Sequence, residues 1–291
     1  MKQAICLYLH VHQPYRIRHY TIFDTARDHN YFNDQTSHAL TNNKFIIEKV
    51  AEKSYRPMNA VLKELLDTVD DFKFSLSIPG LLIDQLAEWA PDVLQSFKDL
   101  VSTGRVEIVA ETYHHSLAFF YSRSEFEAQV QMHRQKMQDT FGFTPTAFRN
   151  TELSYNNDLA YWADKAGYTA IITEGWDPIL DWRSPNFVYK PSYTENIKLL
   201  LKNYKLSDDI AFRFGNQSWE EWPLSAEKYV SWLGASMDNA QVFNLFMDYE
   251  TFGEHQWSST GIFDFMKAMP GIWKNSREER TFMTISEAAT S

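Results

Sequence analysis

The chain has 291 residues, 44% of them hydrophobic and 15% aromatic, which suits one α/β barrel with a sizeable core. Acidic residues outnumber basic ones and give a formal charge of −10, so repulsion from phosphate argues against a nucleic-acid partner. The single cysteine, Cys6, excludes a disulfide within the chain.

The first residues, Met1 to Gln3, lead straight into an apolar strand, without the apolar core and cleavage site of a signal peptide. No apolar run reaches the ~18 residues that a membrane span needs. We therefore expect a cytoplasmic protein that does not contact a membrane.

Strand-like and helix-like segments alternate along the chain. Apolar or alternating runs predict strands over residues 5–9, 72–78, 106–110, 147–148, 168–173 and 242–247. Periodic apolar residues predict helices over residues 45–66, 79–101, 122–141, 161–166, 226–233 and 262–273. Two further strand-like runs are 197–204 and 210–214. This alternation indicates a parallel sheet covered by helices, and about seven strands favour a closed or nearly closed barrel over an open doubly wound sheet.

Local signals refine these elements. Pro57 is expected to break or kink the first helix, because it lacks a backbone N–H. Ser124, followed three residues later by Glu127, fits a capping box at the start of the third helix. Residues 174–192 are rich in Trp, Pro and Asp, and we expect them to leave the barrel near the site.

Four of the predicted strands end in acidic, His and aromatic residues. The polar ends are His10-Val11-His12-Gln13-Pro14, Glu111-Thr112-Tyr113-His114-His115, Arg149-Asn150-Thr151-Glu152 and Asp248-Tyr249-Glu250-Thr251. Parallel strands align their C-terminal ends on one edge of the sheet, where α/β folds build their sites. The pattern therefore predicts one shared active site.

His10 and His12 fall on the same face of the first strand, because strand side chains alternate with period two. Such a pair can hold a metal, bind a polar substrate, or steady the first turn by hydrogen bonds. Further metal ligands are available by composition, although no compact zinc motif is present. These candidates are Glu111, His115, Asp248 and His255.

Glu107 lies inside its strand and shares a face with Val109 and Glu111. An acid that points into a barrel must be paired or bound to a ligand. Glu107 therefore belongs either to a buried support network, which we favour, or to the lining of a sugar pocket.

Glu152 and Asp248 are the candidate catalytic carboxylates. The nearby Arg149 would keep Glu152 ionised, as a nucleophile requires, unless the two form an ordinary surface pair. Asp248 follows an apolar run, where burial would raise its pKa and suit it to proton donation, unless it merely caps the next segment. Two carboxylates in different surroundings are what cleavage of a glycosidic bond requires.

Four motifs occur together and in a fixed order. They are His10-Val11-His12-Gln13-Pro14, Gly104-Arg105-Val106-Glu107-Ile108-Val109, Arg149-Asn150-Thr151-Glu152-Leu153 and Asp248-Tyr249-Glu250-Thr251-Phe252-Gly253. At these residues the chain resembles glycoside hydrolase family 57, and in particular its α-amylase-like branch.

The resemblance implies an incomplete (β/α)7 barrel, a distorted form of the TIM barrel, and retaining cleavage of an α-glucan or maltooligosaccharide without a metal or other cofactor. It implies Glu152 as the nucleophile and Asp248 as the acid/base, with carboxyl groups ~5–5.5 Å apart. It also implies that other residues of the four clusters and the nearby Trp257 bind substrate. These residues are His10, His12, Gln13, Glu107, Glu111, His115, Arg149, Glu250 and Trp257.

The resemblance further implies that residues 1–275 form the catalytic barrel. Residues 276–291 would then start a C-terminal helical region that is largely absent from this chain.

Three alternatives to a retaining α-amylase-type hydrolase stay open. A 4-α-glucanotransferase would use the same covalent intermediate with a sugar hydroxyl as acceptor. A metal-dependent polysaccharide deacetylase would use His10 and His12 as ligands. A glucan-binding protein would bind maltooligosaccharides without turnover.

Overall fold

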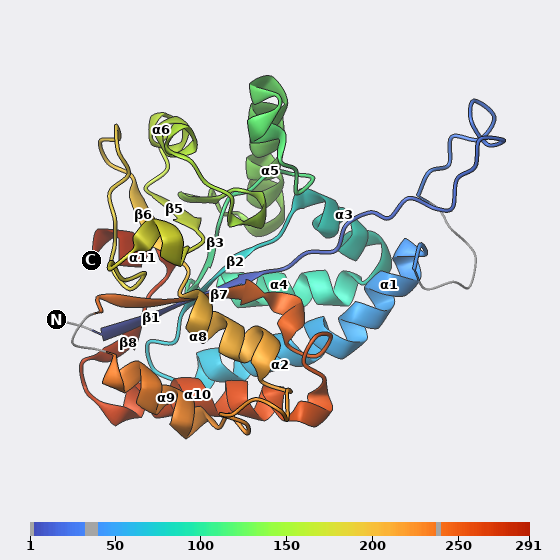
Figure 1. Cartoon of the computed structure of the whole chain (residues 1–291). Helices are drawn as coiled ribbons and strands as arrows, with labels where there is room; N and C mark the ends of the chain where they lie inside the picture. Colours follow the sequence, from blue (N-terminus) through green and yellow to red (C-terminus); the bar gives the residue numbers. More distant parts are fainter. Residues whose placement is uncertain (1–2, 33–39, 237–239) are drawn as a thin grey trace.

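Seven parallel strands form an incomplete barrel in the computed structural model, which describes residues 3–32, 40–236 and 240–291 (Figure 1). The strands are β1 (Gln3–His10), β2 (Phe74–Ser77), β3 (Val106–Ile108), β4 (Ala147–Arg149), β5 (Ala170–Thr173), β6 (Lys198–Leu201) and β7 (Val242–Asp248). An eighth short strand, β8 (Arg280–Phe282), pairs with the beginning of β1. The expected (β/α)7 barrel is confirmed.

The strands follow one another around the barrel in the order β7-β1-β2-β3 and β4-β5-β6. A bridge between Ala110 and Phe148 joins the two sheets beyond the end of β3. At the other seam, between β6 and β7, the Asn203 N–H donates to the Asn244 carbonyl at 2.9 Å, and the Asn244 amide donates to Leu201 at 2.9 Å. The described residues form no strand ladder at this seam, so the barrel is incomplete there.

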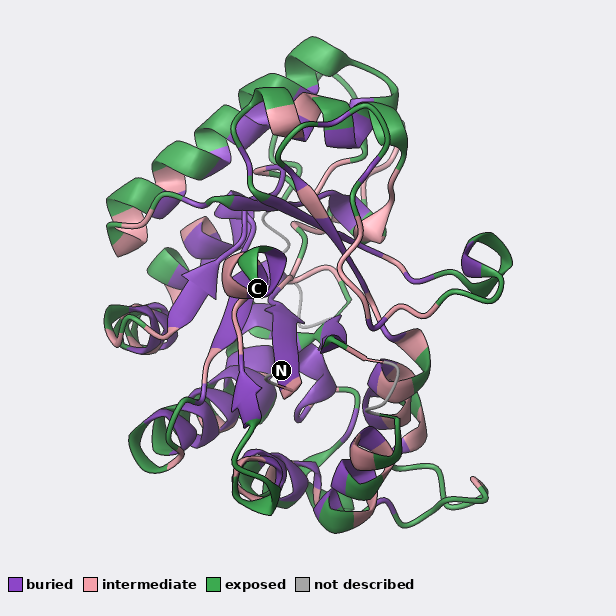
Figure 2. Cartoon of the chain, turned by 90° about the vertical axis from the view of Figure 1, so that its left-hand side faces the viewer, coloured by how far each residue is buried: buried purple, intermediate pink, exposed green. Residues whose placement is uncertain are grey.

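Helices surround the strands, with buried inner faces and exposed outer faces (Figure 2). They are α1 (Asn43–Val50), α2 (Arg56–Thr68), α3 (Gly80–Trp89), α4 (Pro91–Ser102), α5 (Arg123–Phe141), α6 (Asn157–Lys165), α7 (Asp177–Leu180), α8 (Tyr204–Asp208), α9 (Ala226–Ala235), α10 (Ile262–Ser276) and α11 (Ile285–Thr290). Residues 11–32, which follow β1 and are blue in Figure 1, extend away from the barrel. None of these helices combines the length and apolar character required to cross a bilayer.

Successive side chains of each strand alternate between an outer core and an inner core. Ile5, Leu7 and Leu9 of β1 belong to the outer core that the helices cover, whereas Cys6 and Tyr8 belong to the inner core of the barrel. The same period of two orients every strand, because successive side chains of a strand point to opposite faces. Inward-facing residues therefore form layers inside the barrel.

The last helix fills the inner core. Ile285, Ala288 and Ala289 of α11 pack against the inward-facing residues, and the carboxylate of Glu107 accepts hydrogen bonds from the backbone N–H and hydroxyl of Ser286. With β8 paired to β1, residues 280–290 are part of the barrel. The boundary expected after residue 275 therefore separates no structural units in the described chain, and it falls inside α10.

Proline shapes the helices of the first half of the chain. Pro91 starts α4, so residues 79–101 form two helices and not one. Pro57 lies in the first turn of α2, directly after a π-helical turn, η1 (Ala51–Tyr55). Pro57 cannot donate to the carbonyl of Lys53, and that carbonyl faces Gly253 so closely that a Cβ on Gly253 would lie 1.9 Å from the oxygen. The glycine of the fourth motif thus permits this close packing.

Two other local expectations differ from the structure. Residues 209–213 form a π-helical turn, η4 (Asp209–Arg213), and β6 is the strand of that region. Helix α5 is capped by the Ser122 side chain, which accepts from the N–H of Glu125 at 3.4 Å, so the cap lies two residues before Ser124.

Candidate active site

The site is built on the last inward-facing layer of the barrel. His10 ends β1, Asp248 ends β7, and the two residues are register partners in the sheet. Arg149 ends β4, and Glu111 lies just beyond β3 on the same face as Glu107. The expectation that these polar strand ends converge is confirmed, because the following contacts join all four.

Glu111 is the buried hub of this layer. Its Oε2 lies 3.3 Å from His10 Nε2, 3.4 Å from His115 Nδ1 and 3.6 Å from Arg149 Nη1. Burial opposes its charge, but His10, His115 and Arg149 outweigh burial and hold the pKa of Glu111 well below its usual range. Glu111 is therefore ionised and orients the groups that reach the two candidate carboxylates.

Glu152 is presented by a short 3₁₀ turn, η3 (Thr151–Leu153), directly after β4. Glu152 and Leu153 both have positive φ, at 58° and 53°, a conformation that costs roughly 1–2 kcal/mol per residue. The Thr173 hydroxyl donates to the Leu153 carbonyl at 2.7 Å and holds the turn against β5. The constrained backbone leaves the Glu152 side chain 73% exposed at the mouth of the barrel.

His115 holds the Glu152 carboxylate. Its Nε2 lies 3.0 Å from Glu152 Oε1. This hydrogen bond lowers the pKa of Glu152, as do the charges of His115 and Arg149. Burial raises the pKa, but its effect is outweighed. Burial disfavours a charged His115, but its hydrogen bonds with Glu111 and Glu152 outweigh burial and raise the pKa of His115. The expected ionised Glu152 is supported, with His115 as its main partner rather than Arg149.

The pKa of Asp248 is lowered, whereas the sequence led us to expect a raised pKa. Burial raises its pKa, as expected, but the close polar contact with His10 and the charges of Arg149 and His255 outweigh burial and lower the pKa of Asp248 to about 2. The His10 Nδ1 lies 3.6 Å from Asp248 Oδ1. The Asp248 side chain makes no capping hydrogen bond to the next turn, so the capping alternative is wrong.

Both carboxylates line one cavity of about 210 Å³, and the charge of Asp248 opposes the ionisation of Glu152. Glu174 and Lys202, which pair at 3.5 Å, line it as well and were missed from the sequence. They directly follow β5 and β6, so the rule that found the other polar strand ends, applied to these strands, would have included them.

His12 forms a stack of imidazole rings with His10 and His115, with a distance of 4.0 Å between the ring centres of His12 and His115. Burial and the neighbouring His115 and His10 lower the pKa of His12 to about 3, so the ring is neutral. His12 thus packs against the two histidines that contact the carboxylates.

Glu250 is a buried carboxyl group that hydrogen-bonds the backbone of His12. Its Oε1 accepts from the His12 N–H at 3.0 Å and from the Tyr55 hydroxyl. Burial and the charge of Asp248 raise the pKa of Glu250 to about 8. The two hydrogen bonds lower this pKa, but their effect is smaller. Glu250 therefore carries a proton at neutral pH and anchors the backbone between His12 and Asp248.

This proton predicts a pH-dependent stability. Glu250 keeps its proton up to about pH 8 when folded but loses it near its ordinary value of 4.5 when unfolded. The folded state then binds more protons between these values, so the free energy of unfolding falls as the pH rises toward 8. We expect Glu250→Gln, which cannot ionise, to flatten the decline of Tm between pH 5 and pH 9. Thermal melts of this variant, of wild type and of the exposed control Glu195→Gln measure it, and parallel curves for wild type and Glu250→Gln would contradict it.

Of the nine residues expected to bind substrate, only His10 and Arg149 line the cavity that holds the two carboxylates. His12, Glu111, His115 and Glu250 belong to the network described above, and the other three lie outside it. Glu107 is buried with Ser75 and Ser286, which favours the support network over the sugar pocket. Gln13 accepts from Arg16 at 2.8 Å, and Trp257 is exposed. Neither Gln13 nor Trp257 lines the cavity that holds the two carboxylates, and their substrate binding stays a prediction.

His10, Glu111 and His115 bring three potential metal-ligand atoms within 4.8 Å of one another. His12, the other residue of the expected pair, is not in this group. The guanidinium of Arg149 lies 3.3 Å from His10 Nε2 and 3.6 Å from Glu111 Oε2, the same atoms that would bind a cation. A metal would have to displace this positive charge, so the group fits an ion-pair network better than a metal centre.

Comparison with known proteins identifies the family of this chain. The family model "Glycosyl hydrolase family 57" matches residues 6–291. A Methanocaldococcus jannaschii protein named "Putative alpha-amylase" is 49% identical over 229 residues, which are 78% of this chain and 48% of that protein. The chain thus spans about half the length of this relative.

Solved structures share the fold. The 4-alpha-glucanotransferase of Thermococcus litoralis superposes with a TM-score of 0.74 at 18% identity, over 100% of this chain and 40% of that one. The "putative polysaccharide deacetylase" of Mycobacterium smegmatis superposes with a TM-score of 0.64 at 13% identity, over 99% and 89%. At these identities the structures share the barrel, whereas the family match covers nearly the whole chain. The chain belongs to glycosyl hydrolase family 57.

Proposed function

We propose that this protein is a retaining glycoside hydrolase that cleaves α-1,4-glucans through a covalent glycosyl-enzyme. The observation that carries the proposal is the pair of carboxylates, Glu152 and Asp248, on the wall of one cavity at the C-terminal edge of the barrel. Their surroundings differ: Glu152 is held by His115, whereas Asp248 is held by His10. Membership of the family and the alpha-amylase name of a close relative support the α-glucan substrate.

In this mechanism Glu152 attacks the anomeric carbon while Asp248 protonates the leaving oxygen. The lowered pKa and the hydrogen bond from His115 keep Glu152 ionised for attack. Asp248 then removes a proton from water, which cleaves the glycosyl-enzyme and restores both groups.

Asp248 needs a proton for the first step, although its pKa is about 2 in the free protein. Its side chain is 59% exposed there. A sugar bound over Asp248 would exclude water and strengthen the effect of burial, which already favours the protonated form. We therefore infer that substrate binding raises the pKa of Asp248.

A 4-α-glucanotransferase is the second candidate. The protein of Thermococcus litoralis with this name is 22% identical over 253 residues, or 85% of this chain. Transfer would produce oligosaccharides longer than the substrate, whereas hydrolysis produces only shorter ones. Chromatography of the products of maltoheptaose distinguishes the two.

Proton NMR of early maltoheptaose cleavage tests the retaining mechanism. We expect the α-anomer of the new reducing end to appear first, because two successive inversions at the anomeric carbon restore its configuration. Initial appearance of the β-anomer would show that Glu152 is not a nucleophile, and absence of cleavage would contradict the hydrolase proposal.

A further inference from the structure

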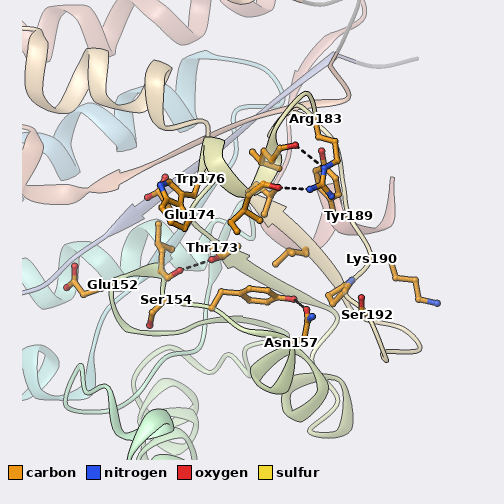
Figure 3. A pocket seen from close by; sticks show the side chains of 17 residues that line it. Glu152, Ser154, Asn157, Thr173, Glu174, Trp176, Arg183, Tyr189, Lys190 and Ser192 are labelled. Atoms are coloured by element: carbon orange, nitrogen blue, oxygen red, sulfur yellow. Dashed lines mark hydrogen bonds between the residues drawn. The ribbon is translucent and has the colours of Figure 1, made fainter.

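A second, larger cavity opens beside Glu152. Its volume is about 600 Å³, almost three times that of the cavity between the carboxylates. It lies between the η3 turn and residues 174–192, which return to the barrel where Tyr189 and Leu199 exchange backbone hydrogen bonds of 2.9 and 2.8 Å. Figure 3 shows Glu152 at one end of this cavity, and Lys190 and Ser192 at the other.

The lining combines an apolar floor with a polar rim. Leu180, Leu199 and Leu201 are buried and form part of the floor, whereas Ser154 and Asn157 offer hydrogen-bonding groups. Large apolar pockets with a few polar groups are typical of small-molecule sites. A sugar chain, with apolar ring faces and hydroxyls at the edges, matches this lining.

Three of the four charged side chains that line the cavity, Glu152, Glu174 and Arg183, have polar partners, and the fourth, Lys190, is exposed. The guanidinium of Arg183 donates to the carbonyls of Leu180 (3.0 Å) and Ile179 (2.5 Å), so it braces the end of α7. Glu174 pairs with Lys202. A neutral ligand therefore suits the cavity better than an anion.

Trp176 is the most exposed of the three aromatic residues that line the cavity, the others being Tyr155 and Tyr189. Its side chain lies next to Glu174 in Figure 3, and the residue is 61% exposed. An exposed tryptophan with a free ring face can pack against an apolar ligand surface, and it does so at little cost in side-chain entropy.

The positions of the two carboxylates indicate which part of the substrate the larger cavity would bind. Glu152 lines both cavities, whereas Asp248 lines the smaller one and is not among the residues around the larger one. Asp248 must lie next to the leaving part of the substrate, because it protonates the departing oxygen. The larger cavity therefore lies on the side of the part that stays attached to Glu152.

We propose that this cavity binds at least two sugar rings on the non-reducing side of the cleaved bond, with Trp176 packing against one of them. The inference rests on the proposed α-glucan cleavage and assigns its substrate-binding direction. The hydrogen bond from Thr173 to Leu153 fixes residues 174–192 relative to the nucleophile, so the bound rings determine which bond reaches Glu152.

The test uses maltoheptaose labelled at its reducing end, with Trp176→Ala as the principal variant. Trp176 also borders a smaller cavity with Tyr204, so Asn157→Ala, which borders only the large one among the cavities described, is the second variant. Trp182→Ala is the matched control, because Trp182 belongs to the same segment, is 86% exposed and does not line the cavity.

We expect Trp176→Ala to raise KM by about 3- to 10-fold, because this is the effect of losing one aromatic contact with the substrate. With fewer rings held on the non-reducing side, cleavage should move toward the non-reducing end and leave longer labelled products. Asn157→Ala should shift the products in the same direction, and Trp182→Ala should match wild type.

A shift of both variants toward shorter labelled products would place the cavity on the leaving-group side and overturn the assignment. Wild-type KM and products in both variants would show that no sugar binds there. If wild type itself neither cleaves nor binds maltoheptaose, measured by calorimetry on Glu152→Gln, the proposed function fails instead.

Discussion

Replacement of Glu152 with alanine is expected to lower the turnover of maltooligosaccharides by at least roughly 10³-fold, because it removes the carboxylate that we propose forms the glycosyl-enzyme. The side chain is 73% exposed, so its removal leaves no cavity in the core and the fold should survive. Rates of reducing-sugar release, together with circular dichroism and thermal melts, measure both effects.

Azide makes the test of Glu152 specific. In Glu152→Ala, azide can enter from the face that the carboxylate occupied and attack a substrate with a good leaving group, such as a nitrophenyl maltoside, to give a β-glycosyl azide. The matched control is Glu195→Ala, since Glu195 is also 73% exposed and pairs with Lys165 on the surface. Turnover by Glu152→Ala at the wild-type rate would eliminate Glu152 as the nucleophile.

Replacement of Asp248 with alanine is expected to slow the cleavage of maltooligosaccharides by roughly 10²–10⁴-fold, the usual contribution of general acid–base catalysis. The loss should be much smaller for formation of the glycosyl-enzyme from a nitrophenyl maltoside, because nitrophenolate leaves without a proton. Burst kinetics of nitrophenol release, compared with steady-state rates, separate the two steps.

The stereochemistry of azide rescue distinguishes Asp248 from Glu152. In Asp248→Ala, azide attacks the glycosyl-enzyme from the face opposite to Glu152 and should give an α-glycosyl azide. Asp92→Ala is the control, because Asp92 has the same 59% side-chain exposure and an ion pair with Arg56 on the surface. Equal losses with natural and nitrophenyl substrates would contradict the acid role of Asp248.

The pKa of Asp248 shows where reasoning from the sequence ends. An aspartate after an apolar strand is expected to be desolvated, and burial does favour its protonated form. The opposite net direction comes from His10, which is 238 positions earlier in the chain and becomes its neighbour only through the pairing of β1 with β7. The partner of Glu152 differs from the expected one for the same reason. Arg149 is near Glu152 in sequence, but the ring of His115 contacts the Glu152 carboxylate.

The alternation of strand-like and helix-like segments was enough to predict the parallel sheet of the barrel, and the polar residues at the strand ends indicated the edge at which the site lies. Period-two patterning decides which side chains face inward, and parallel pairing brings the strand ends together. The sequence could not show that residues 280–290 belong to the barrel, because their short apolar segment is stabilised only by pairing with β1 and by packing in the inner core.

The sequence by itself determined the fold class, the family resemblance and the two candidate carboxylates, since these depend on local patterns and fixed motifs. Only the tertiary structure decided the partners of those carboxylates, the burial of Glu107 beneath α11 and the large cavity beside Glu152. Hydrogen bonds, desolvation and cavities depend on distances between residues far apart in the chain, and folding sets those distances.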